Sequence, residues 1–267
     1  MQEHSVYRRI ASALTVIEVA EPIRWHFEVG TKLQDAYDQT WDDQGRSGIM
    51  LVTRDGSPTG FLDAPFCFDA DQLSLCVEDL AHKIEIWQVV SAETSLFDLI
   101  PLWDRSYYYF VLDGTQLSHF VARHDMDKAA VKAALFALTA ELEERMLRLL
   151  IADQDRIAER FERLNSKSQK KARYLSKKKN LPDAPLAHIQ NTFFPDKVQM
   201  FLATPELTSL LPFANESEAE SYFEFIGRMR NELAHGGSIF NIIKDASELK
   251  SIVDLTEDVI LHLKEQG

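Results

Sequence analysis

Three features that the sequence lacks narrow its function. Its two cysteines, Cys67 and Cys76, have neither the spacing of metal ligands nor enough partners for a disulfide framework, so we expect buried thiols and no metal site. No apolar run approaches the length that spans a bilayer, and residues 1–5 do not open a signal peptide, which predicts a cytoplasmic protein without a membrane partner. No glycine-rich phosphate loop is present, so nothing predicts a nucleotide hydrolase.

The composition is that of a globular protein that is acidic overall. With 267 residues, of which 45% are hydrophobic and 27% charged, the chain is long enough for two ordinary domains. Its net charge of -13 argues against a broad nucleic-acid surface without sequence preference. The charge is uneven, because residues 1–133 contain 11 basic and 21 acidic residues, whereas residues 134–267 contain 18 and 21.

Positive charge is concentrated in one segment of the second half. Residues 167–179 hold seven basic residues and no acidic one. One interpretation is a patch that binds the phosphates of RNA. The other is a solvated segment between helices, whose charge only keeps it in water. The candidate RNA-binding residues are Lys170, Lys171, Arg173, Lys177, Lys178 and Lys179.

Two stretches in the first half, residues 29–63 and 91–122, look like copies of one unit. A threonine precedes an apolar-periodic stretch in each copy, Thr31 in the first and Thr94 in the second, which predicts a capped helix. An Asp-Gly pair then separates two β-prone runs, which predicts a hairpin. The recurrence of this hairpin behind a matching helix indicates an internal repeat.

The repeated unit resembles the CBS domain, a small α/β repeat that pairs and often binds AMP, ADP, ATP or S-adenosylmethionine. The resemblance implies a Thr-x-x-Asp segment after the last strand, whose hydroxyl and carboxylate contact ribose and phosphate. The second copy keeps the carboxylate as Asp125 and has alanine at the hydroxyl position, while the first copy has neither group. Asp125 would then accept from ribose hydroxyls, and Arg123 would reach a phosphate. The alternative is a dimerisation and positioning module without a ligand.

The second half begins with an apolar stripe of helical spacing. The stripe runs over residues 135–164 and predicts one helix of about 30 residues or two in line. It follows the second repeat without a Pro/Gly/Ser-rich linker, so we expect a stiff connection that can transmit a change. On this helix, Glu143 and Glu144 either pair with Arg230 across the bundle or form a solvated face. Prolines between residues 182 and 212 predict shorter helices.

The most informative stretch is residues 230–235, Arg-Asn-Glu-Leu-Ala-His, followed by two glycines. Apolar residues at helical spacing precede it and Gly236 supplies a stop, which predicts the end of a helix. Asn231 and His235 are four residues apart and share a face, with Arg230 on its edge. The dipole at a helix C-terminus favours imidazolium, and arginine can hold a phosphate oxygen while staying charged. This combination can do phosphate chemistry without a metal.

The spacing of arginine, a polar residue and histidine resembles the signature of the HEPN domains, which are all-α bundles. Domains of this type are commonly metal-independent ribonucleases that work as dimers, with two motifs facing each other. The resemblance implies that Arg230 and His235 are the catalytic pair, that Asn231 supports them, and that no cofactor is required. It also allows a role as a toxin or antiviral defence effector. The alternatives are a helix cap with satisfied charges or a bundle without catalysis.

These observations predict an α+β fold with a CBS-like tandem repeat over residues 1–130 and a HEPN-like all-α domain over residues 131–267. The predicted function is a metal-independent endoribonuclease, a homodimer with RNA as substrate and no DNA specificity. The CBS pair would regulate or assemble it, with an adenine nucleotide as the candidate ligand. The alternative is a non-enzymatic nucleotide-sensing regulator or docking protein with an inactive HEPN bundle.

Overall fold

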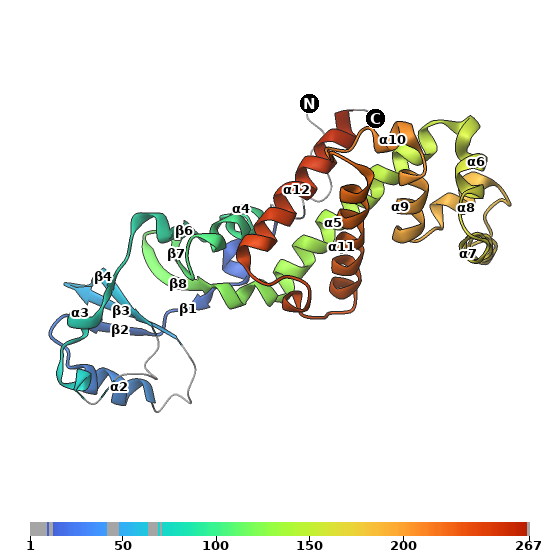
Figure 1. The fold of residues 1–267 in the computed structure, drawn as a ribbon. Helices are drawn as coiled ribbons and strands as arrows, with labels where there is room; N and C mark the ends of the chain where they lie inside the picture. The colour runs from blue at the N-terminus through green and yellow to red at the C-terminus, as the bar shows by residue number, and fades with distance from the viewer. Residues whose placement is uncertain (1–9, 11–12, 42–47, 64–68, 70, 266–267) are drawn as a thin grey trace. The chain divides into compact units, whose positions relative to one another are not determined.

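The computed structural model describes residues 10, 13–41, 48–63, 69 and 71–265. Two compact units are present, one over Leu14–Lys128 and one that contains Ala129 and the residues after it. The first unit contains the β-strands and the second is helical, so the predicted mixture of α and β structure is confirmed (Figure 1). Cys76 is a free, half-buried thiol, and Cys67 lies outside the described residues.

The first unit contains two four-stranded sheets with the same pattern. One sheet has the order β1-β8-β7-β6 and the other the order β2-β3-β4-β5. In each sheet one edge strand, β6 or β2, pairs in parallel with its neighbour, and the other two pairings are antiparallel. The strands are β1 (Glu21–Pro22), β2 (Trp25–Glu28), β3 (Ile49–Arg54), β4 (Ser57–Asp63), β5 (His82–Lys83), β6 (Val89–Ser91), β7 (Tyr108–Asp113) and β8 (Gln116–Ala122).

The predicted internal repeat is confirmed. Helix α2 (Leu33–Trp41) precedes the hairpin β3–β4, and helix α4 (Leu96–Leu99) precedes the hairpin β7–β8. Each copy also has a strand before its helix, β2 or β6, which pairs in parallel with the first hairpin strand. The sequence does not predict these strands because four and three residues are too few for a visible alternation.

The predicted threonine caps are wrong. Helix α4 is capped by Ser95, whose hydroxyl accepts from the Phe97 N–H at 3.2 Å, instead of by Thr94. In the first copy, the Thr31 hydroxyl donates to the Glu28 carbonyl at 2.6 Å. The hydroxyl of Thr31 therefore closes the turn after β2 instead of accepting from the helix.

The two hairpins differ by one position at their turns. In the first, Asp55 and Gly56 both have positive φ, 53° and 74°, which gives the two-residue turn that matches the twist of a hairpin. In the second, Gly114 has φ 60° and Asp113 is still paired, with Gln116. The Asp-Gly pairs recur in the sequence, but they occupy neighbouring positions of the turn.

Strand β3 is buried on both faces and organises the core of this unit. Ile49 and Leu51 belong to an apolar cluster that includes Phe110 and Phe120 of the other sheet. The alternate residues of β3 pack instead with α2 and with α3 (Val77–Leu80), in a second cluster that contains Phe27, Leu33, Ala36, Met50, Val52, Leu62 and Val77. Because side chains alternate along a strand, β3 joins the two layers.

The second unit is built around α5 (Ala129–Ala152), which contacts most of the other helices. The others are α6 (Ile157–Glu162), α7 (Ser166–Lys178), α8 (Pro185–Gln190), α9 (Phe194–Leu202), α10 (Pro205–Thr208), α11 (Glu216–Ala234) and α12 (Ala246–Glu265). Within the described part of the chain, no helix is both long and apolar enough to cross a bilayer.

The stripe over residues 135–164 is divided between two helices. Asp153 has extended backbone angles, φ -95° and ψ 98°, and a turn of 3-10 helix over Gln154–Arg156 precedes α6. The buried guanidinium of Arg160 donates to the Leu150 carbonyl at 2.6 Å. A side chain of α6 thus satisfies a carbonyl that the end of α5 leaves without a helical partner.

Asp125 is a buried cap at the end of the first unit. Its side chain is 0% exposed and accepts from the Ala122 N–H at 2.6 Å, at the start of the 3-10 helix η5 (Arg123–Asp127). Its other oxygen lies 2.7 Å from the Lys128 ammonium, which is also 3.2 Å from Glu21. Burial lowers the pKa of Lys128, but these two carboxylates outweigh burial and raise it above its usual value.

We expect Asp125→Ala to lower the free energy of unfolding of the first unit by about 1–3 kcal/mol, because it leaves a buried N–H unsatisfied. Urea unfolding followed by tryptophan fluorescence measures this, since all four tryptophans lie between residues 25 and 103. The control Asp113→Ala removes an exposed carboxylate and should change stability by no more than about 0.5 kcal/mol. Equal stabilities of the two variants would contradict the capping role.

Candidate functional site

The motif helix α11 ends where the sequence predicts. His235 is the C-cap, and Gly236 follows with φ 71°, a left-handed conformation that glycine adopts without strain. The Gly236 N–H donates to the Leu233 carbonyl at 3.2 Å, and the Gly237 N–H donates to the Glu232 carbonyl at 3.0 Å. These two bonds form a Schellman motif, which fixes the position of His235 at the helix end.

Arg230 is held by an ion pair inside the bundle. Its guanidinium lies 2.9 Å from Oε2 of Glu143 on α5, which is one of the two pairings considered from the sequence. Glu144 instead pairs with Arg148 on its own helix at 2.7 Å. The guanidinium carbon of Arg230 is 5.8 Å from the ring centroid of Phe136 and 6.0 Å from that of Phe194. Arg230 is therefore half-buried and held in place.

Glu143 also binds a second cation, Lys197 of α9. Its Oε1 is 2.7 Å from the Lys197 ammonium, which also donates to the Thr192 carbonyl at 2.8 Å. The Lys197 side chain is 5% exposed. One carboxylate cannot neutralise two cations, so Glu143, Lys197 and Arg230 together keep a net positive charge.

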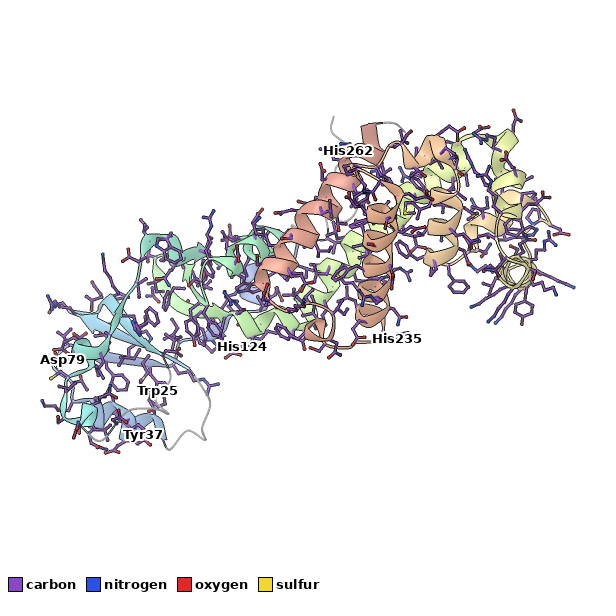
Figure 2. All side chains as sticks on the ribbon, in the orientation of Figure 1. Trp25, Tyr37, Asp79, His124, His235 and His262 are labelled. Atoms are coloured by element: carbon purple, nitrogen blue, oxygen red, sulfur yellow. The ribbon has the colours of Figure 1, made fainter. Side chains whose placement is uncertain are left out.

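Asn231 and His235 are exposed, unlike Arg230. Among the described residues, the His235 ring has no hydrogen bond that would hold it, and Figure 2 labels it at the end of α11. Arg230 and His235 are five positions apart in the sequence, which is about 7.5 Å along a helix axis. The structure therefore brings Arg230 and Asn231 to one site, with His235 beyond it.

A groove of about 840 Å³ joins this site to the basic segment. Its lining includes three residues of α11, Arg228, Arg230 and Asn231, and two of α7, Lys167 and Lys171. Phe193, the residue directly before α9, lines it as well. Lys171 places its ammonium 3.9 Å from the centroid of the exposed Phe193 ring. His235 is not among the residues that line the groove.

The groove has an acidic end and a basic end. At the start of α9, Phe194 packs on α11 at Gly227, where an added Cβ would lie 3.7 Å from the Phe194 ring. At the other end of α9, Leu202 lines a pocket together with Glu216 from the start of α11. Helices α9 and α11 thus run in opposite directions. The acidic end holds Glu220 and Glu224, and the basic end holds Lys171, Phe193, Arg228, Arg230 and Asn231, together with the carboxylate of Asp196.

The basic segment is a helix, α7, rather than an irregular connection between helices. Ala172 and Ser176 form its buried face, and the Ser176 hydroxyl contacts His188 and Asn191. Of the six candidate RNA-binding residues, Lys171 alone lines the groove. Lys179 donates to Asn191 at 2.7 Å and Arg173 lies over Phe161, while Lys170, Lys177 and Lys178 are exposed elsewhere on α7.

The two candidate ligand residues of the first unit, Asp125 and Arg123, both contact other groups of the protein. Asp125 is the buried cap described above, and a ribose would have to displace its partners. Arg123 donates to the Trp103 carbonyl at 3.0 Å and lies 5.7 Å from the Tyr107 ring centroid, so its guanidinium is not free. Among the described residues, Glu21, His124 and Asp125 have oxygen or nitrogen atoms close enough for a metal, but the Lys128 ammonium already contacts two of them.

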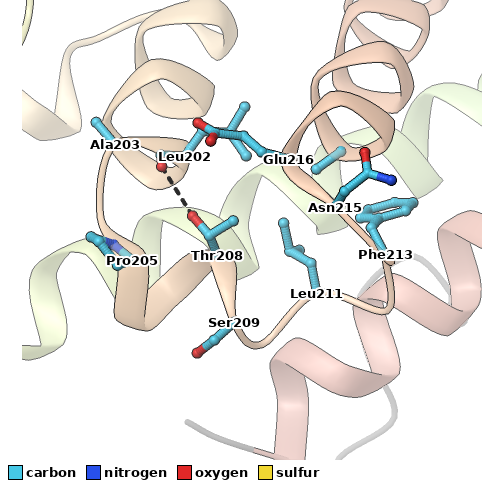
Figure 3. A pocket seen from close by; sticks show the side chains of 10 residues that line it. Leu202, Ala203, Pro205, Thr208, Ser209, Leu211, Phe213, Asn215 and Glu216 are labelled. Atoms are coloured by element: carbon cyan, nitrogen blue, oxygen red, sulfur yellow. Dashed lines mark hydrogen bonds between the residues drawn. The ribbon is translucent and has the colours of Figure 1, made fainter.

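A second hollow of about 440 Å³ lies between α9, α10 and the start of α11 (Figure 3). Its lining is mostly apolar, with Glu216 as its ionisable side chain. The Thr208 hydroxyl donates to the Leu202 carbonyl at 3.0 Å on its wall. Leu202 lines both this hollow and the groove. The hollow carries no group that would do chemistry.

Sequence reasoning missed Phe193, Lys197 and Arg228. The sequence does contain a pattern that points to Phe193, because Pro195 predicts that a helix begins at about this place and Phe193 directly precedes it. Of two adjacent phenylalanines at a helix start, one packs inward and the other is left exposed. Nothing in the sequence pairs Lys197 with Glu143, which is 54 residues away.

No protein-family model and no curated protein matches the sequence. The solved structures similar to part of it include two of the CBS domain of the bacterial CNNM/CorC family Mg²⁺ transporter, one in complex with the novel inhibitor IGN95a and one with ATP. The first has 15% identity and a TM-score of 0.37, covering 48% of this chain and 80% of that one. The second has 16% and 0.36, covering 48% and 92%. Nothing about a ligand or an activity follows from this likeness, and the HEPN resemblance stays a prediction.

Proposed function

We propose that the protein is a metal-independent endoribonuclease of the HEPN kind, whose active site is at the basic end of the groove. The observation that carries the proposal is the meeting of Arg230 and Asn231 with Lys171 and Phe193 around one groove. Cations that hold phosphates, beside an aromatic ring that can stack on a base, are the usual components of a site for single-stranded nucleic acid. RNA is the substrate because DNA lacks the 2'-hydroxyl nucleophile.

The reaction is attack of a ribose 2'-oxygen on the adjacent phosphorus, with cleavage of the bond from phosphorus to the 5'-oxygen. His235 takes the proton of the 2'-hydroxyl while water protonates the departing 5'-oxygen, or it gives a proton to that oxygen while water takes the proton of the 2'-hydroxyl. Arg230 stabilises the charge that develops on the phosphorane oxygens, and Asn231 orients His235 or binds a phosphate oxygen. The products are a 2',3'-cyclic phosphate and a 5'-hydroxyl, and the step needs neither a metal nor a cofactor.

The proposed site needs a two-fold homodimer to bring a histidine to the groove. Arg230 is fixed by Glu143, whereas His235 lies about 7.5 Å further along the axis and does not line the groove. Two motifs that face each other across a dimer would place the His235 of one protomer against the Arg230 of its partner. The CBS-like half would assemble or regulate this dimer, with an adenine nucleotide as its candidate ligand.

One observation favours the alternative function, a non-catalytic regulator or docking protein. The ion pair with Glu143 occupies part of the Arg230 guanidinium, as it would in a purely structural cap. Incubation of the purified protein with total RNA in the presence of a chelator separates the two functions. Cleavage supports the endoribonuclease, and intact RNA supports the regulator.

We expect His235→Ala and Arg230→Ala each to reduce RNA cleavage by about 10²-fold or more, because a single proton donor or charge stabiliser is typically worth that much. The fold should survive both changes, since Lys197 still pairs with Glu143 when Arg230 is removed. Rates are measured on a labelled RNA in chelator, with cyclic phosphate ends identified in the products. His262→Ala, which removes an exposed histidine of α12, is the control and should cleave normally.

Activity that disappears with chelator, or that survives both substitutions, would contradict this site. A 2'-deoxy substitution at the scissile nucleotide should stop cleavage in the wild-type protein, because it removes the nucleophile.

We expect a mixture of Arg230→Ala and His235→Ala proteins to regain activity that neither has alone. If the arginine and histidine of a site come from different protomers, each mixed dimer has one intact site, so an equal mixture that exchanges fully recovers about a quarter of wild-type activity. Light scattering establishes the dimer, and cleavage by the mixture is measured after exchange. A concentration-independent monomer, or no recovery in mixed dimers, would rule out the shared site.

A further inference from the structure

Phe193 is an exposed aromatic ring with a defined position. Its side chain is 44% exposed, whereas the neighbouring Phe194 is buried in the bundle. The Phe193 N–H donates to the Asp196 carboxylate at 3.1 Å, which fixes the backbone at the start of α9. Lys171 covers part of the ring, with its ammonium 3.9 Å from the centroid. The ring is therefore held in place and remains accessible at the groove.

Cations outnumber carboxylates around this ring on the side of the motif. Lys171 lies over it, Arg230 and Arg228 line the same end of the groove, and the Asp196 carboxylate is the opposing charge there. Glu224 lies six residues before Arg230 on α11, about 9 Å along the axis, and Glu220 is one turn further away. The cations at the basic end, which outnumber the Asp196 carboxylate there, therefore attract a polyanion, and the acidic end repels it.

Helix α7 extends the same surface away from the groove. Lys171, Tyr174 and Lys178 are spaced by three and four residues, so they share a face of the helix. Tyr174 is 64% exposed, and both lysines are exposed as well. A chain of phosphates that leaves the basic end therefore meets further positive charge and a second aromatic ring.

We propose that the basic end binds RNA as a single strand, with one unpaired base stacked on Phe193 in place of the Lys171 ammonium, which moves from the ring to the adjoining phosphate and holds it together with Arg230. This inference rests on the proposed function, which it deepens by naming the form of the substrate. A duplex cannot use the ring, because its bases are stacked on each other and paired. The site therefore selects loops, bulges and unpaired ends over helical RNA.

The test is binding of a short single-stranded 2'-deoxy oligonucleotide that carries 2-aminopurine, whose fluorescence falls when the base stacks. The full-length protein cannot cleave this probe, so binding is measured apart from catalysis. Phe193→Ala should weaken binding by about tenfold, because one stack of a base on an aromatic ring contributes on that order, and should abolish the fluorescence change. Phe240→Ala is the matched control, since Phe240 is also 44% exposed and lies outside the groove.

The phosphate contact has its own test. Lys171→Gln should weaken binding and reduce the slope of log affinity against log salt by about 0.7, the value for one phosphate contact on a single strand. Lys177→Gln, on the same helix but outside the groove, should change both less.

Equal affinities of Phe193→Ala and Phe240→Ala, or duplex binding as tight as single-strand binding, would overturn the inference. Stacking that persists in a protein without cleavage activity would support the inference and reject the nuclease function alone. Cleavage without any effect of Phe193→Ala on stacking would reject the inference alone.

Discussion

The site depends on one carboxylate, Glu143. It accepts Lys197 on one oxygen and Arg230 on the other, at 2.7 and 2.9 Å. The three residues come from α9, α11 and the central helix α5, so a single group ties both walls of the groove to the core of the bundle. Removing charges from water is costly, and a shared carboxylate compensates two cations incompletely. The positive charge that these three side chains keep favours an added anion at this end of the bundle, while the Asp196 carboxylate, which also lines the groove, opposes it.

The same arrangement orients Arg230 before any ligand arrives. Its guanidinium is held by Glu143 and lies 5.8 and 6.0 Å from the ring centroids of Phe136 and Phe194. A group that is already oriented loses little freedom when a phosphate binds, which is the condition under which a single charge contributes most to a reaction. His235 is different, because the Schellman motif fixes only its backbone, and its exposed ring has no hydrogen bond among the described residues.

Local patterns in the sequence predict the elements better than they predict the contacts. The repeat, the Asp-Gly hairpins and the glycine that ends α11 follow from rules that involve a few neighbouring residues. The break at Asp153 does not, because it depends on Arg160, which reaches back to the end of α5. The same holds for the site: Arg230, Asn231 and Lys171 can be selected from the sequence by type and spacing. Phe193 and Lys197 become meaningful only when α7, α9 and α11 are packed together.

The sharing of Leu202 between the groove and the apolar hollow has a consequence for the shape of the bundle surface. This one side chain forms part of the wall of two spaces, of about 840 and 440 Å³. A smaller residue at this position would enlarge both spaces together, beside Glu220 in the groove and Glu216 in the hollow. The shape of the groove at its acidic end therefore depends on a leucine that also shapes the hollow, far along α9 from the residues to which we assign the chemistry.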